Sequence, residues 1–269
     1  VRALLIYLEG IRDGERFVAL AEEARERGIP LGVLKVGKSA SSREAVQSHT
    51  AALAGDPEVW EAIFRQYGIF PLEDAEDIAT LGLAFGTFRR PRGNRVAILT
   101  TSGGAGIVTA DRCVDAGLAV PPLPGETRRE MERYLPSFGS SRNPVDMTAQ
   151  VINDPEGYAG VLRAAEACAE VDMVIAVHSM ITGSAGESMA RDLAESFDRS
   201  DKPTACCWLI DQKNGGEFLA FLRQRGVPLF SSPRECARAL GALARIPEPR
   251  PGAPRPRPSR APVLADFNL

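Results

Sequence analysis

Residues 3–36 read ALLIYLEGIRDGERFVALAEEARERGIPLGVLKV, and this stretch decides the fold class. The run Ala3–Leu8 is continuously apolar, as expected of a strand buried on both faces of a parallel sheet. Between residues 14 and 27, apolar side chains recur at helical spacing, which predicts an amphipathic helix. They are Phe17, Leu20, Ala21 and Ala24. The run Leu31–Val36 predicts a second buried strand, and the order strand, helix, strand indicates parallel pairing.

The alternation of strands and helices continues to about residue 246 and places the chain in the α/β class. Further strands are expected at Arg95–Thr100, Leu118–Val120, Val171–Val177, Thr204–Leu209 and Val227–Phe230. Further helices are expected to begin near Pro57, Gly106, Pro155, Ala185, Gly216 and Pro233. Pro228 suits an edge strand or a strand start, because proline cannot donate a ladder hydrogen bond. The polar segment Gly37–Gln47 predicts a long loop.

A change in composition marks two boundaries along the chain. The segment Phe88–Asn94 (FRRPRGN) is polar and contains proline and glycine, which indicates a domain boundary. We therefore expect one domain over residues 1–90 and a second over residues 95–246. The sequence then becomes PEPRPGAPRPRPSRAP, so residues 247–269 are interpreted as a Pro/Arg-rich linker without secondary structure. Val1 lies directly in an apolar run with no initiator methionine, and we interpret the chain as a fragment of a longer protein.

Composition and charge exclude several classes of function. The 269 residues are 44% hydrophobic and 25% charged, with a formal net charge of −3, so no basic surface for nucleic acid is expected. No apolar run has the length of a membrane span, and no membrane partner is expected. The five cysteines include no CxxC pair, which argues against a disulfide framework or a metal site. This cysteine usage favours the reducing cytoplasm.

His49 and Glu9 are the first candidates for chemistry. His49 is one of only two histidines and follows the polar segment beyond the second strand, while Glu9 follows the first strand. Because ligands of parallel sheets bind beyond the carboxyl ends of the strands, both residues are expected at one edge if the strands are neighbours. A carboxylate that accepts the Nδ1–H of an imidazole leaves Nε2 free as a nucleophile. On spacing alone, a loop histidine and a solvated carboxylate explain the same residues.

Two glycine-rich segments lie between a strand and a helix, where main-chain amides bind anions. Ser102–Gly106 lacks the third glycine of a dinucleotide fingerprint, but its amides suit a phosphate. Thr182–Gly186 (TGSAG) follows the run that ends at His178, and its serine and glycines also suit an anion. His178 itself is interpreted as a strand-end histidine held by backbone hydrogen bonds. Cys206 and Cys207 are interpreted as buried packing residues.

Several sequence blocks resemble the acyl-CoA synthetases that form ADP, which are relatives of succinyl-CoA synthetase. The first blocks are Tyr7–Ile11 (YLEGI), Leu34–Lys38 (LKVGK) and Ser48–Gly55 (SHTAALAG). Ala97–Thr100 (AILT), Gly103–Gly106 (GGAG) and Asn143–Asp146 (NPVD) follow in the family's order. The similarity spans about residues 1–245, and SHTAALAG is its specific part. Ala51 departs from the family, which usually has glycine at that position.

The resemblance implies two flavodoxin-like, three-layer domains with mainly parallel sheets. In the family, a CoA-binding Rossmann domain precedes these two domains, and an ATP-grasp unit follows them or is a separate subunit. The chain would then contain the two middle domains and the start of a linker. Its partners would be the two missing parts and a small-molecule acyl substrate, and a homo-oligomer remains open.

The resemblance also implies roles for individual residues. The family's active-site histidine corresponds to His49, and the glutamate that orients it corresponds to Glu9. Two helix N-termini, one from each domain, face the phosphorylated imidazole in the family, and here they correspond to Asp13–Gly14 and Ser184–Gly186. The residues that the resemblance assigns to phosphate binding are Gly10, Asp13, Gly14, Ser48, Thr50, Gly183, Ser184 and Gly186. No metal ligand is assigned.

The implied reaction forms an acyl phosphate from acyl-CoA and phosphate, passes the phosphoryl group to Nε2 of His49, and transfers it to ADP. The cofactors are CoA and ATP or ADP with Mg²⁺, and none of them is expected to bind this fragment tightly. The fragment is therefore expected to be an inactive part of an acid–thiol ligase. Two alternatives keep the fold, namely the regulatory module of a protein lysine acetyltransferase and a flavodoxin-like module that binds a small effector.

Overall fold

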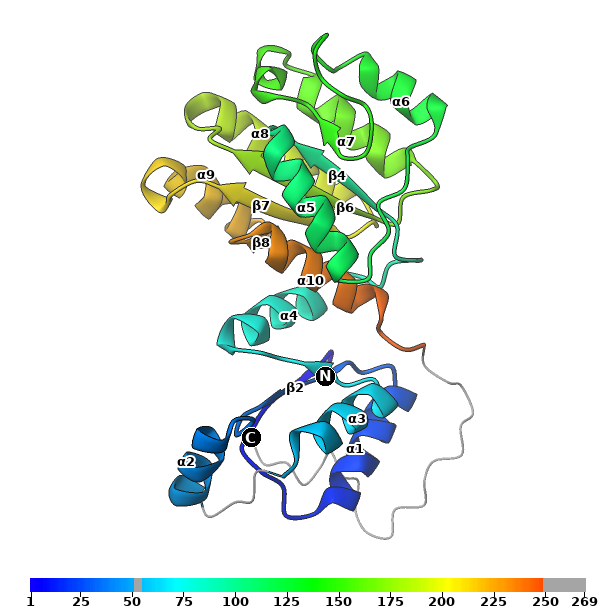
Figure 1. Ribbon diagram of the computed structural model, residues 1–269. Helices are drawn as coiled ribbons and strands as arrows, with labels where there is room; N and C mark the ends of the chain where they lie inside the picture. The colour runs from blue at the N-terminus through cyan, green and yellow to red at the C-terminus, as the bar shows by residue number, and fades with distance from the viewer. Residues whose placement is uncertain (51–54, 249–269) are drawn as a thin grey trace. The chain divides into compact units, whose positions relative to one another are not determined.

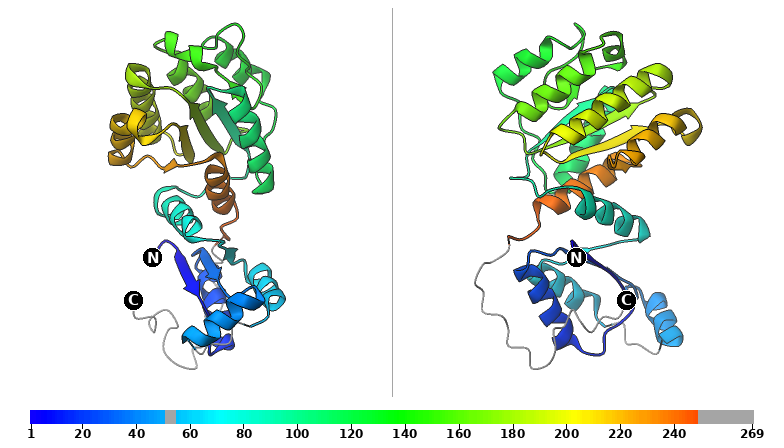
Figure 2. Two further views of the ribbon diagram at one scale, coloured as in Figure 1. Left: turned by 60° about the vertical axis from the view of Figure 1, so that its left-hand side comes forward. Right: turned by 180° about the vertical axis from the view of Figure 1, so that it is seen from behind.

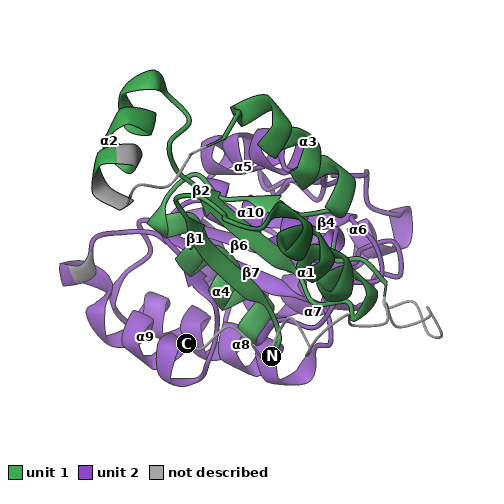
Figure 3. Cartoon of the chain, turned by 90° about the horizontal axis from the view of Figure 1, so that it is seen from below, with its two compact units in different colours: residues 1–86, 246–269 green, residues 87–245 purple. Residues whose placement is uncertain are grey.

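The computed structural model describes residues 1–50 and 55–248 (Figures 1 and 2). They form two compact units, of which the first includes Val1–Gly86 and the second is Thr87–Arg245 (Figure 3). Neighbouring strands within both sheets are parallel, and helices pack on the faces of the sheets, which confirms the α/β fold class. The domain limits expected from the sequence stay predictions.

The first unit is built around a three-stranded sheet. Its elements are β1 (Leu4–Leu8), α1 (Gly14–Glu26), β2 (Leu31–Lys35), α2 (Ala40–Thr50), α3 (Pro57–Tyr67), β3 (Phe70–Pro71) and α4 (Ala75–Thr87). The sheet order is β1-β2-β3, and every residue of the central strand β2 is buried. α1 and α3 pack on one face, where the rings of Phe17 and Trp60 meet edge to face at 5.5 Å. α4 reaches the sheet through Phe85, which contacts Phe70 of β3.

The second unit is built around a five-stranded sheet. Its elements are β4 (Val96–Thr100), α5 (Gly103–Asp115), α6 (Gly125–Glu132), β5 (Val145–Asp146), the 3₁₀ helix η1 (Ala149–Asn153), α7 (Gly157–Ala167), β6 (Met173–Ser179), α8 (Gly183–Arg199), β7 (Thr204–Leu209), α9 (Gln212–Gln224), β8 (Leu229–Phe230) and α10 (Pro233–Ala244). α5 and α10 lie on one face of the sheet, and α7, α8 and α9 lie on the other (Figures 1 and 2). The unit therefore has three layers.

The strand order of the second sheet is β5-β4-β6-β7-β8, which is the doubly wound order of flavodoxin-like folds. The chain passes from β4 to β5 on one side and then returns to β6 on the other side. The carboxyl ends of β4 and β6 therefore form the point where the strand order reverses, and ligands of open α/β sheets bind at such a point. In the first sheet, β1, β2 and β3 follow one another as β6, β7 and β8 do.

Local sequence explains why α1 lies close to its predicted limits and why α3 begins at Pro57, as expected. Four apolar residues of α1 form its buried face, namely Phe17, Leu20, Ala21 and Ala24, as expected. α3 starts at Pro57, whose missing N–H is harmless in a first helical turn. Before it, the side chain of Asp56 accepts the amide of Glu58 at 2.9 Å. α3 ends at Gly68, whose φ of 68° is the left-handed conformation that favours glycine.

The prediction of a loop over Gly37–Gln47 is wrong, because α2 begins at Ala40. Ser39 caps this helix, since its Oγ accepts the amide of Ser42 at 3.1 Å. In return, Ser42 Oγ accepts the amide of Ser39 at 3.0 Å. Among the described side chains of α2, Val46 alone is buried. The helix therefore lacks the apolar periodicity on which its prediction would depend.

The prediction of a strand at Leu118–Val120 is also wrong. Within this segment, Ala119 alone forms an isolated parallel bridge, with Arg95. The amide of Ala119 donates to Asn94 O at 2.9 Å, and Val96 donates to Ala119 O at 2.8 Å. The apolar run after α5 thus joins the sheet at a single position and then turns away.

Three of the four sheet edges formed by the described strands are short. β3, β5 and β8 each contain two residues. Pro71 is part of β3, and Pro228 directly precedes β8, which confirms the expectation that Pro228 belongs to an edge. Proline and short length both discourage pairing with another strand.

All five cysteines are buried and unbridged. Burial raises the pKa of the Cys113 thiol to about 12 and raises the pKa values of Cys206 and Cys236 well above their ordinary range. These thiols therefore pack as small apolar groups, as expected for Cys206 and Cys207. In residues 1–50 and 55–248, no helix combines the length and the apolar character needed to cross a lipid bilayer.

Candidate functional site

The carboxyl ends of β1 and β2 carry the first group of candidate residues. Glu9 follows β1 directly, and Lys35 is the last residue of β2. Lys35 is buried, and its Nζ donates to the main-chain oxygen of Glu9 at 2.8 Å and to that of Val36. The ammonium also lies over the ring of Trp60, 5.5 Å from the ring centroid. Lys35 therefore ties the segment that carries Glu9 to the end of β2.

Lys35 is a site residue that the sequence analysis missed. Burial lowers the pKa of Lys35, the charge of Lys38 lowers it further, and the carboxylate of Glu9 acts in the opposite direction. The available signal was a lysine inside the apolar run Leu31–Val36, because a buried ammonium persists only where it has partners. Lys35 thus brings a positive charge next to Glu9.

The N-terminus of α1 lies just beyond Glu9 in the chain. Asp13 caps this helix, and its side chain accepts the main-chain N–H of Arg16 at 2.9 Å. Gly14 is the first helical residue, and Gly10 lies in the irregular segment that leads to it. The Asp13 carboxylate already interacts with the positive end of the helix dipole. A phosphate at this helix end would have that carboxylate as a neighbour, which weakens the attraction.

His49 lies in the last turn of α2, the helix that follows β2. Its side chain and that of Thr50 lie outside the described part of the chain, as do residues 51–54, which include the alanine that departs from the family pattern. Ser48 is exposed, and its Oγ donates to the carbonyl oxygen three residues earlier in α2 at 2.9 Å. A contact between Glu9 and His49 stays a prediction. The parallel pairing of β1 with β2 is consistent with this prediction, because it brings the carboxyl ends of both strands to one edge of the sheet.

The second group of candidate residues lies at the carboxyl ends of β4 and β6. α5 begins after β4 and α8 begins after β6, so both helix N-termini emerge where the strand order reverses. The residues before these helices, Ser102 and Thr182, make no side-chain cap. Gly183 and Ser184 are exposed in the first turn of α8. Uncapped N–H groups at a helix start attract anions.

The starts of α5 and α8 differ in charge. At α5, the Asp146 carboxylate lies so near Gly103 that a Cβ on the glycine would be 2.8 Å from Oδ2. The other oxygen of Asp146 accepts the amide of Thr148 at 2.9 Å. The first turn of α8 contains no acidic residue. The start of α8 is therefore the more favourable of the two for an anion.

The turn before α8 is held by hydrogen bonds from neighbouring strands. Trp208 Nε1 donates to Ile181 O at 3.1 Å, and the amide of Ser179 donates to Thr101 Oγ1 at 2.9 Å. Met180 has a φ of 61°, which is rare for a residue with a side chain, and it is 76% exposed. Backbone strain of this kind persists where the surroundings fix it, and it is frequent beside ligand sites.

Gly186 has a packing role in this arrangement. It is buried in α8, and a Cβ at this position would lie 2.8 Å from the ring of Phe218 in α9. The glycine lets α8 and α9 approach closely, which helps to fix the direction of α8. Packing accounts for Gly186 without a ligand, and its predicted part in phosphate binding stays a prediction.

His178 lies at the end of β6 and is fully buried. Its Nε2 is 2.8 Å from the hydroxyl oxygen of Tyr158, and its ring meets Tyr158 and Trp208 edge to face. Burial lowers the pKa of His178 to about 3, so the ring is neutral at physiological pH. His178 is a structural histidine, as interpreted from the sequence. Its hydrogen-bond partner is the hydroxyl of Tyr158, whereas a backbone group was expected.

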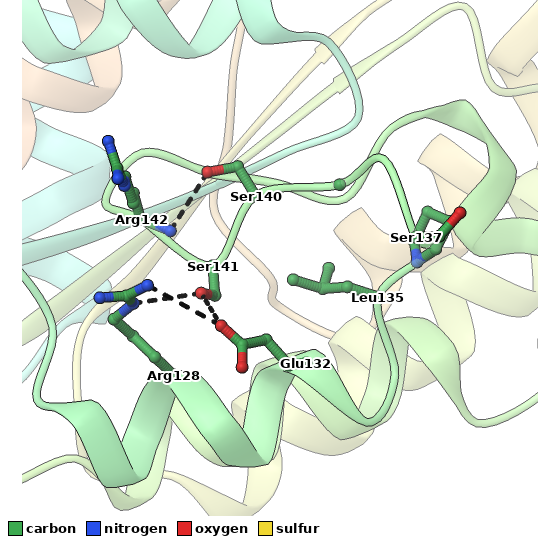
Figure 4. A pocket seen from close by; sticks show the side chains of 9 residues that line it. Arg128, Glu132, Leu135, Ser137, Ser140, Ser141 and Arg142 are labelled. Atoms are coloured by element: carbon green, nitrogen blue, oxygen red, sulfur yellow. Dashed lines mark hydrogen bonds and ion pairs between the residues drawn. The ribbon is translucent and has the colours of Figure 1, made fainter.

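A cavity of about 400 Å³ in the second unit is lined by α6 and the loop that follows it (Figure 4). Ser141 Oγ donates to Glu132 Oε1 at 2.6 Å and accepts a hydrogen bond from Arg128 Nε at 3.2 Å. Figure 4 shows these three side chains pointing toward one another. Because these side chains satisfy one another's hydrogen-bonding groups, their arrangement is explained by its contribution to the stability of the loop.

A larger cavity, of about 720 Å³, is lined by residues 89–92 and by residues around the C-terminal ends of α7 and α8. Two of its cations have clear protein partners: Arg199 pairs with Glu166 at 2.8 Å, and Lys202 Nζ donates to Cys168 O. Lysine and arginine commonly stabilise the negative ends of helices in this way. In the described residues, no group of three His, Cys, Asp or Glu side chains is arranged to hold a metal ion.

Each unit thus has candidate residues at the carboxyl edge of its own sheet. In the first unit these are Glu9, Gly10, Asp13, Gly14 and the missed Lys35. In the second unit they are Gly183 and Ser184, together with the start of α5. Helix N-termini and cations are groups that can stabilise the negative charge of a phosphoryl group.

Comparison with known proteins identifies the family. A model described as "Succinyl-CoA ligase like flavodoxin domain" matches residues 1–85, and a model described as "Ligase-CoA domain" matches residues 96–240. The alpha subunit of the ADP-forming acetate–CoA ligase II of Pyrococcus furiosus is 32% identical over 244 residues, which are 90% of this chain and 53% of that subunit. The alpha subunit of ligase I from the same organism is 30% identical, over 90% of this chain and 52% of its own length.

A solved structure agrees with these relatives. The dinucleotide-forming acetyl-coenzyme A synthetase 1 of Ca. Korarchaeum cryptofilum, in complex with phosphate and ADP, superimposes with a TM-score of 0.80 at 26% identity. The match covers 91% of this chain and 53% of that one. The chain therefore spans about half the length of the relatives that it matches. With both of its units matched in order, the chain belongs to the family of ADP-forming acyl-CoA synthetases.

Proposed function

We propose that this chain is the phosphoryl-carrying core of an ADP-forming acyl-CoA ligase, with His49 as the carrier and Glu9 as the residue that orients it. The observation that carries the proposal is the parallel pairing of β1 and β2. Their carboxyl ends lead to Glu9 and to α2, the helix that includes His49. The relatives are ligases, which favours the enzyme over a regulatory or effector-binding module.

The proposed step is a nucleophilic displacement at phosphorus. The lone pair of His49 Nε2 attacks the phosphorus of an acyl phosphate, a P–N bond forms, and the P–O bond to the acyl group breaks to release a carboxylate. The proton on Nδ1 stays on the ring, where Glu9 accepts its hydrogen bond. The phosphoryl group then passes to the terminal oxygen of ADP, which gives ATP and restores the neutral imidazole. Two transfers through a covalent intermediate replace one difficult transfer.

The groups around the histidine would stabilise the phosphoryl charge. We assign this role mainly to the first amides of α8, at Gly183 and Ser184, because the first turn of α8 has no side-chain cap and no acidic residue. The start of α1 beyond Gly10 would contribute less, because Asp13 already caps it. Lys35 would hold the Glu9 segment in place through its bond to Glu9 O. In this proposal, CoA and ATP with Mg²⁺ bind in the part of the protein that corresponds to the other half of the relatives.

The test is transfer of label from radiolabelled ATP in the complete protein, which includes the ATP-binding part. The wild-type protein should carry a label that is lost in acid and kept in alkali, as expected for phosphohistidine. His49→Asn should abolish the label, and Glu9→Gln should slow labelling without removing the nucleophile. Glu44→Gln is the matched control, because it makes the same change as Glu9→Gln at an exposed position of α2 and should leave labelling unchanged.

Two outcomes would contradict the proposal. An acid-stable label on Ser48 or Thr50 would identify a different nucleophile. Full labelling of His49→Asn would show that the phosphoryl group does not reside on this residue. Thermal unfolding of each variant serves as a control for folding.

A further inference from the structure

α8 and α9 both begin at the carboxyl edge of the second sheet, but their first turns are held in different ways. Asp211 caps α9, because its side chain accepts the amide of Asn214 at 2.8 Å. Thr182, which directly precedes α8, makes no such hydrogen bond. A helix start without a cap is less stable than a capped one. α8 therefore depends on other contacts for a fixed start.

The turn that leads into α8 has an unusual backbone. Met180 has a φ of 61° and Gly183 has a φ of 57°, so both lie in the left-handed region. For Met180 this conformation costs free energy, because its Cβ is crowded there, and it persists where the surroundings hold it. Ile181 lies between these two residues and is buried. The turn thus needs a firm contact near its centre.

Trp208 supplies this contact. Its indole Nε1 donates to Ile181 O at 3.1 Å, and the hydrogen bond is buried. Trp208 belongs to β7, where it lies beside His178 of β6 in the parallel ladder. Its ring meets the His178 ring edge to face, with the centroids 4.6 Å apart. The hydrogen bond therefore ties the turn to a side chain that two central strands hold in place.

The Trp208 ring also supports the first turn of α8 through Phe218 of α9. The centroids of the Trp208 and Phe218 rings are 4.7 Å apart. Gly186 of α8 lies so near the Phe218 ring that a Cβ on the glycine would be 2.8 Å from it. Trp208 thus holds the residue before the helix directly, and it holds the first helical turn through one neighbour.

This arrangement fixes the start of α8 without occupying its amides. A capping side chain accepts N–H groups of the first turn, as Asp211 does in α9, and a carboxylate there also repels an anion. The N–H of Trp208 instead holds a carbonyl oxygen that precedes the helix. No side-chain cap therefore occupies the first amides of α8, although the start of the helix is held.

We propose that Trp208 is a positioning residue for phosphoryl transfer, which fixes the start of α8 in place of a capping side chain and leaves its amides open to the phosphoryl group. This inference rests on the proposed function, in which the amides of Gly183 and Ser184 stabilise that group. Trp208 itself does not touch the phosphoryl group and acts through Ile181. Because stabilisation by fixed amides depends on their geometry, a small shift of the turn slows the transfer.

The test compares Trp208→Phe with the wild type in the complete protein, by the initial rate of acid-labile labelling from radiolabelled ATP. Phenylalanine keeps a ring in the cluster but cannot donate to Ile181 O. Labelling should slow by about tenfold or more. The ATP concentration that gives half the maximal rate should stay the same, because ATP binds elsewhere in the proposed function. An unchanged labelling rate would overturn the inference.

Tyr158→Phe is the matched control. It removes a buried hydroxyl from the same ring cluster, where the oxygen lies 2.8 Å from His178 Nε2, but it removes no bond to the turn. The variant should have a lower melting temperature, because His178 loses its partner, and an unchanged labelling rate. Equal slowing in Tyr158→Phe and Trp208→Phe would show that Trp208 acts through general stability, against the inference.

Thr182→Asp, added to Trp208→Phe, separates positioning from simple stabilisation of the helix. The aspartate should cap α8 and raise the melting temperature, but its carboxylate would occupy the amides and repel the phosphoryl group. The double variant should therefore be more stable and still slower in labelling. Restored labelling would mean that α8 needs only a stable start, which contradicts the inference.

The wild-type protein separates failure of this inference from failure of the proposed function. A wild-type protein without acid-labile label on His49 would contradict the proposed function, and this inference with it. A wild-type label on His49 together with full labelling of Trp208→Phe would contradict this inference alone.

Discussion

His178 shows how a single buried residue makes the stability of the second unit depend on pH. The folded protein holds its ring neutral, with a pKa of about 3, whereas the unfolded chain has the ordinary value near 6.5. Protonation below pH 6.5 therefore favours the unfolded chain. The stability that is present above pH 6.5 is lost as the pH falls toward 3, and the loss at pH 5 is about 2 kcal/mol.

Urea unfolding at pH 7 and pH 5 checks this expectation. The wild-type protein should lose about 2 kcal/mol more than His178→Gln between the two pH values, because glutamine does not titrate but can still bond to Tyr158. A lower stability of the variant at both pH values does not affect this comparison. An equal loss in the two proteins would mean that the His178 ring titrates normally in the fold.

At the scale of the element, Asn143 completes the edge of β4. β5 pairs only with the last two residues of β4, so the earlier residues need another partner on that side. The Asn143 side chain supplies it, because Oδ1 accepts the amide of Ile98 at 3.0 Å and Nδ2 donates to Val96 O at 2.8 Å. Nδ2 also donates to Pro121 O at 3.0 Å. One side chain thus takes the place of a stretch of strand.

Asn143→Ala should lower the free energy of unfolding by about 2–4 kcal/mol, because main-chain groups of β4 lose their partners. Chemical denaturation of the 269-residue chain measures this change. Asn94→Ala is the matched control, since Asn94 is exposed and donates one hydrogen bond, to Gly117 O at 3.0 Å. Its loss should cost less than about 1 kcal/mol. Similar losses in the two variants would show that the hydrogen bonds of Asn143 to β4 contribute no more stability than one exposed hydrogen bond.

The elements that the sequence predicted are those that bury a repeating apolar pattern. α1 and β7 were predicted closely, because Phe17, Leu20, Ala21 and Ala24 mark one face of α1 and Thr204–Trp208 is buried at every residue. α2 was missed because its stability depends on a serine cap and little burial. β3 and β5 are two residues long and show no periodicity. Leu118–Val120 is apolar without being a strand, which pattern alone cannot distinguish.

The sequence predicted those residues of the candidate site that belong to a motif or follow directly after a predicted strand. Glu9, Gly183 and Ser184 lie at carboxyl edges of sheets, as the order of strands and helices suggests. Lys35 was missed because a lysine in a strand is usually assumed to face solvent, and burial becomes visible only once α3 places Trp60 over it. The packing of Gly186 against Phe218 could not be predicted, because it depends on the contact between α8 and α9, and no local sequence pattern encodes that contact.

At the scale of the whole molecule, the 269-residue chain by itself should make no acyl-CoA. It corresponds to about half of its ligase relatives, and in the proposed mechanism CoA and ATP bind outside it. A steady-state assay of the purified chain with ATP, CoA and a panel of carboxylic acids should show no thioester above background. Adding the remaining part of the protein should restore turnover. Turnover by the chain alone would show that it binds both cofactors.

The burial of all five thiols makes the chain suitable for site-specific fluorescent labelling. Maleimides react with thiolates, and burial leaves all five native cysteines slow to react while the protein stays folded. The raised pKa values of Cys113, Cys206 and Cys236 slow these three further. Substitutions at exposed positions, such as Glu22→Cys in the first unit and Asp111→Cys in the second, would therefore accept dyes without prior removal of native cysteines. Energy transfer between two such dyes would then report whether the distance between the two labelled positions changes when the remaining part of the protein and its substrates are added.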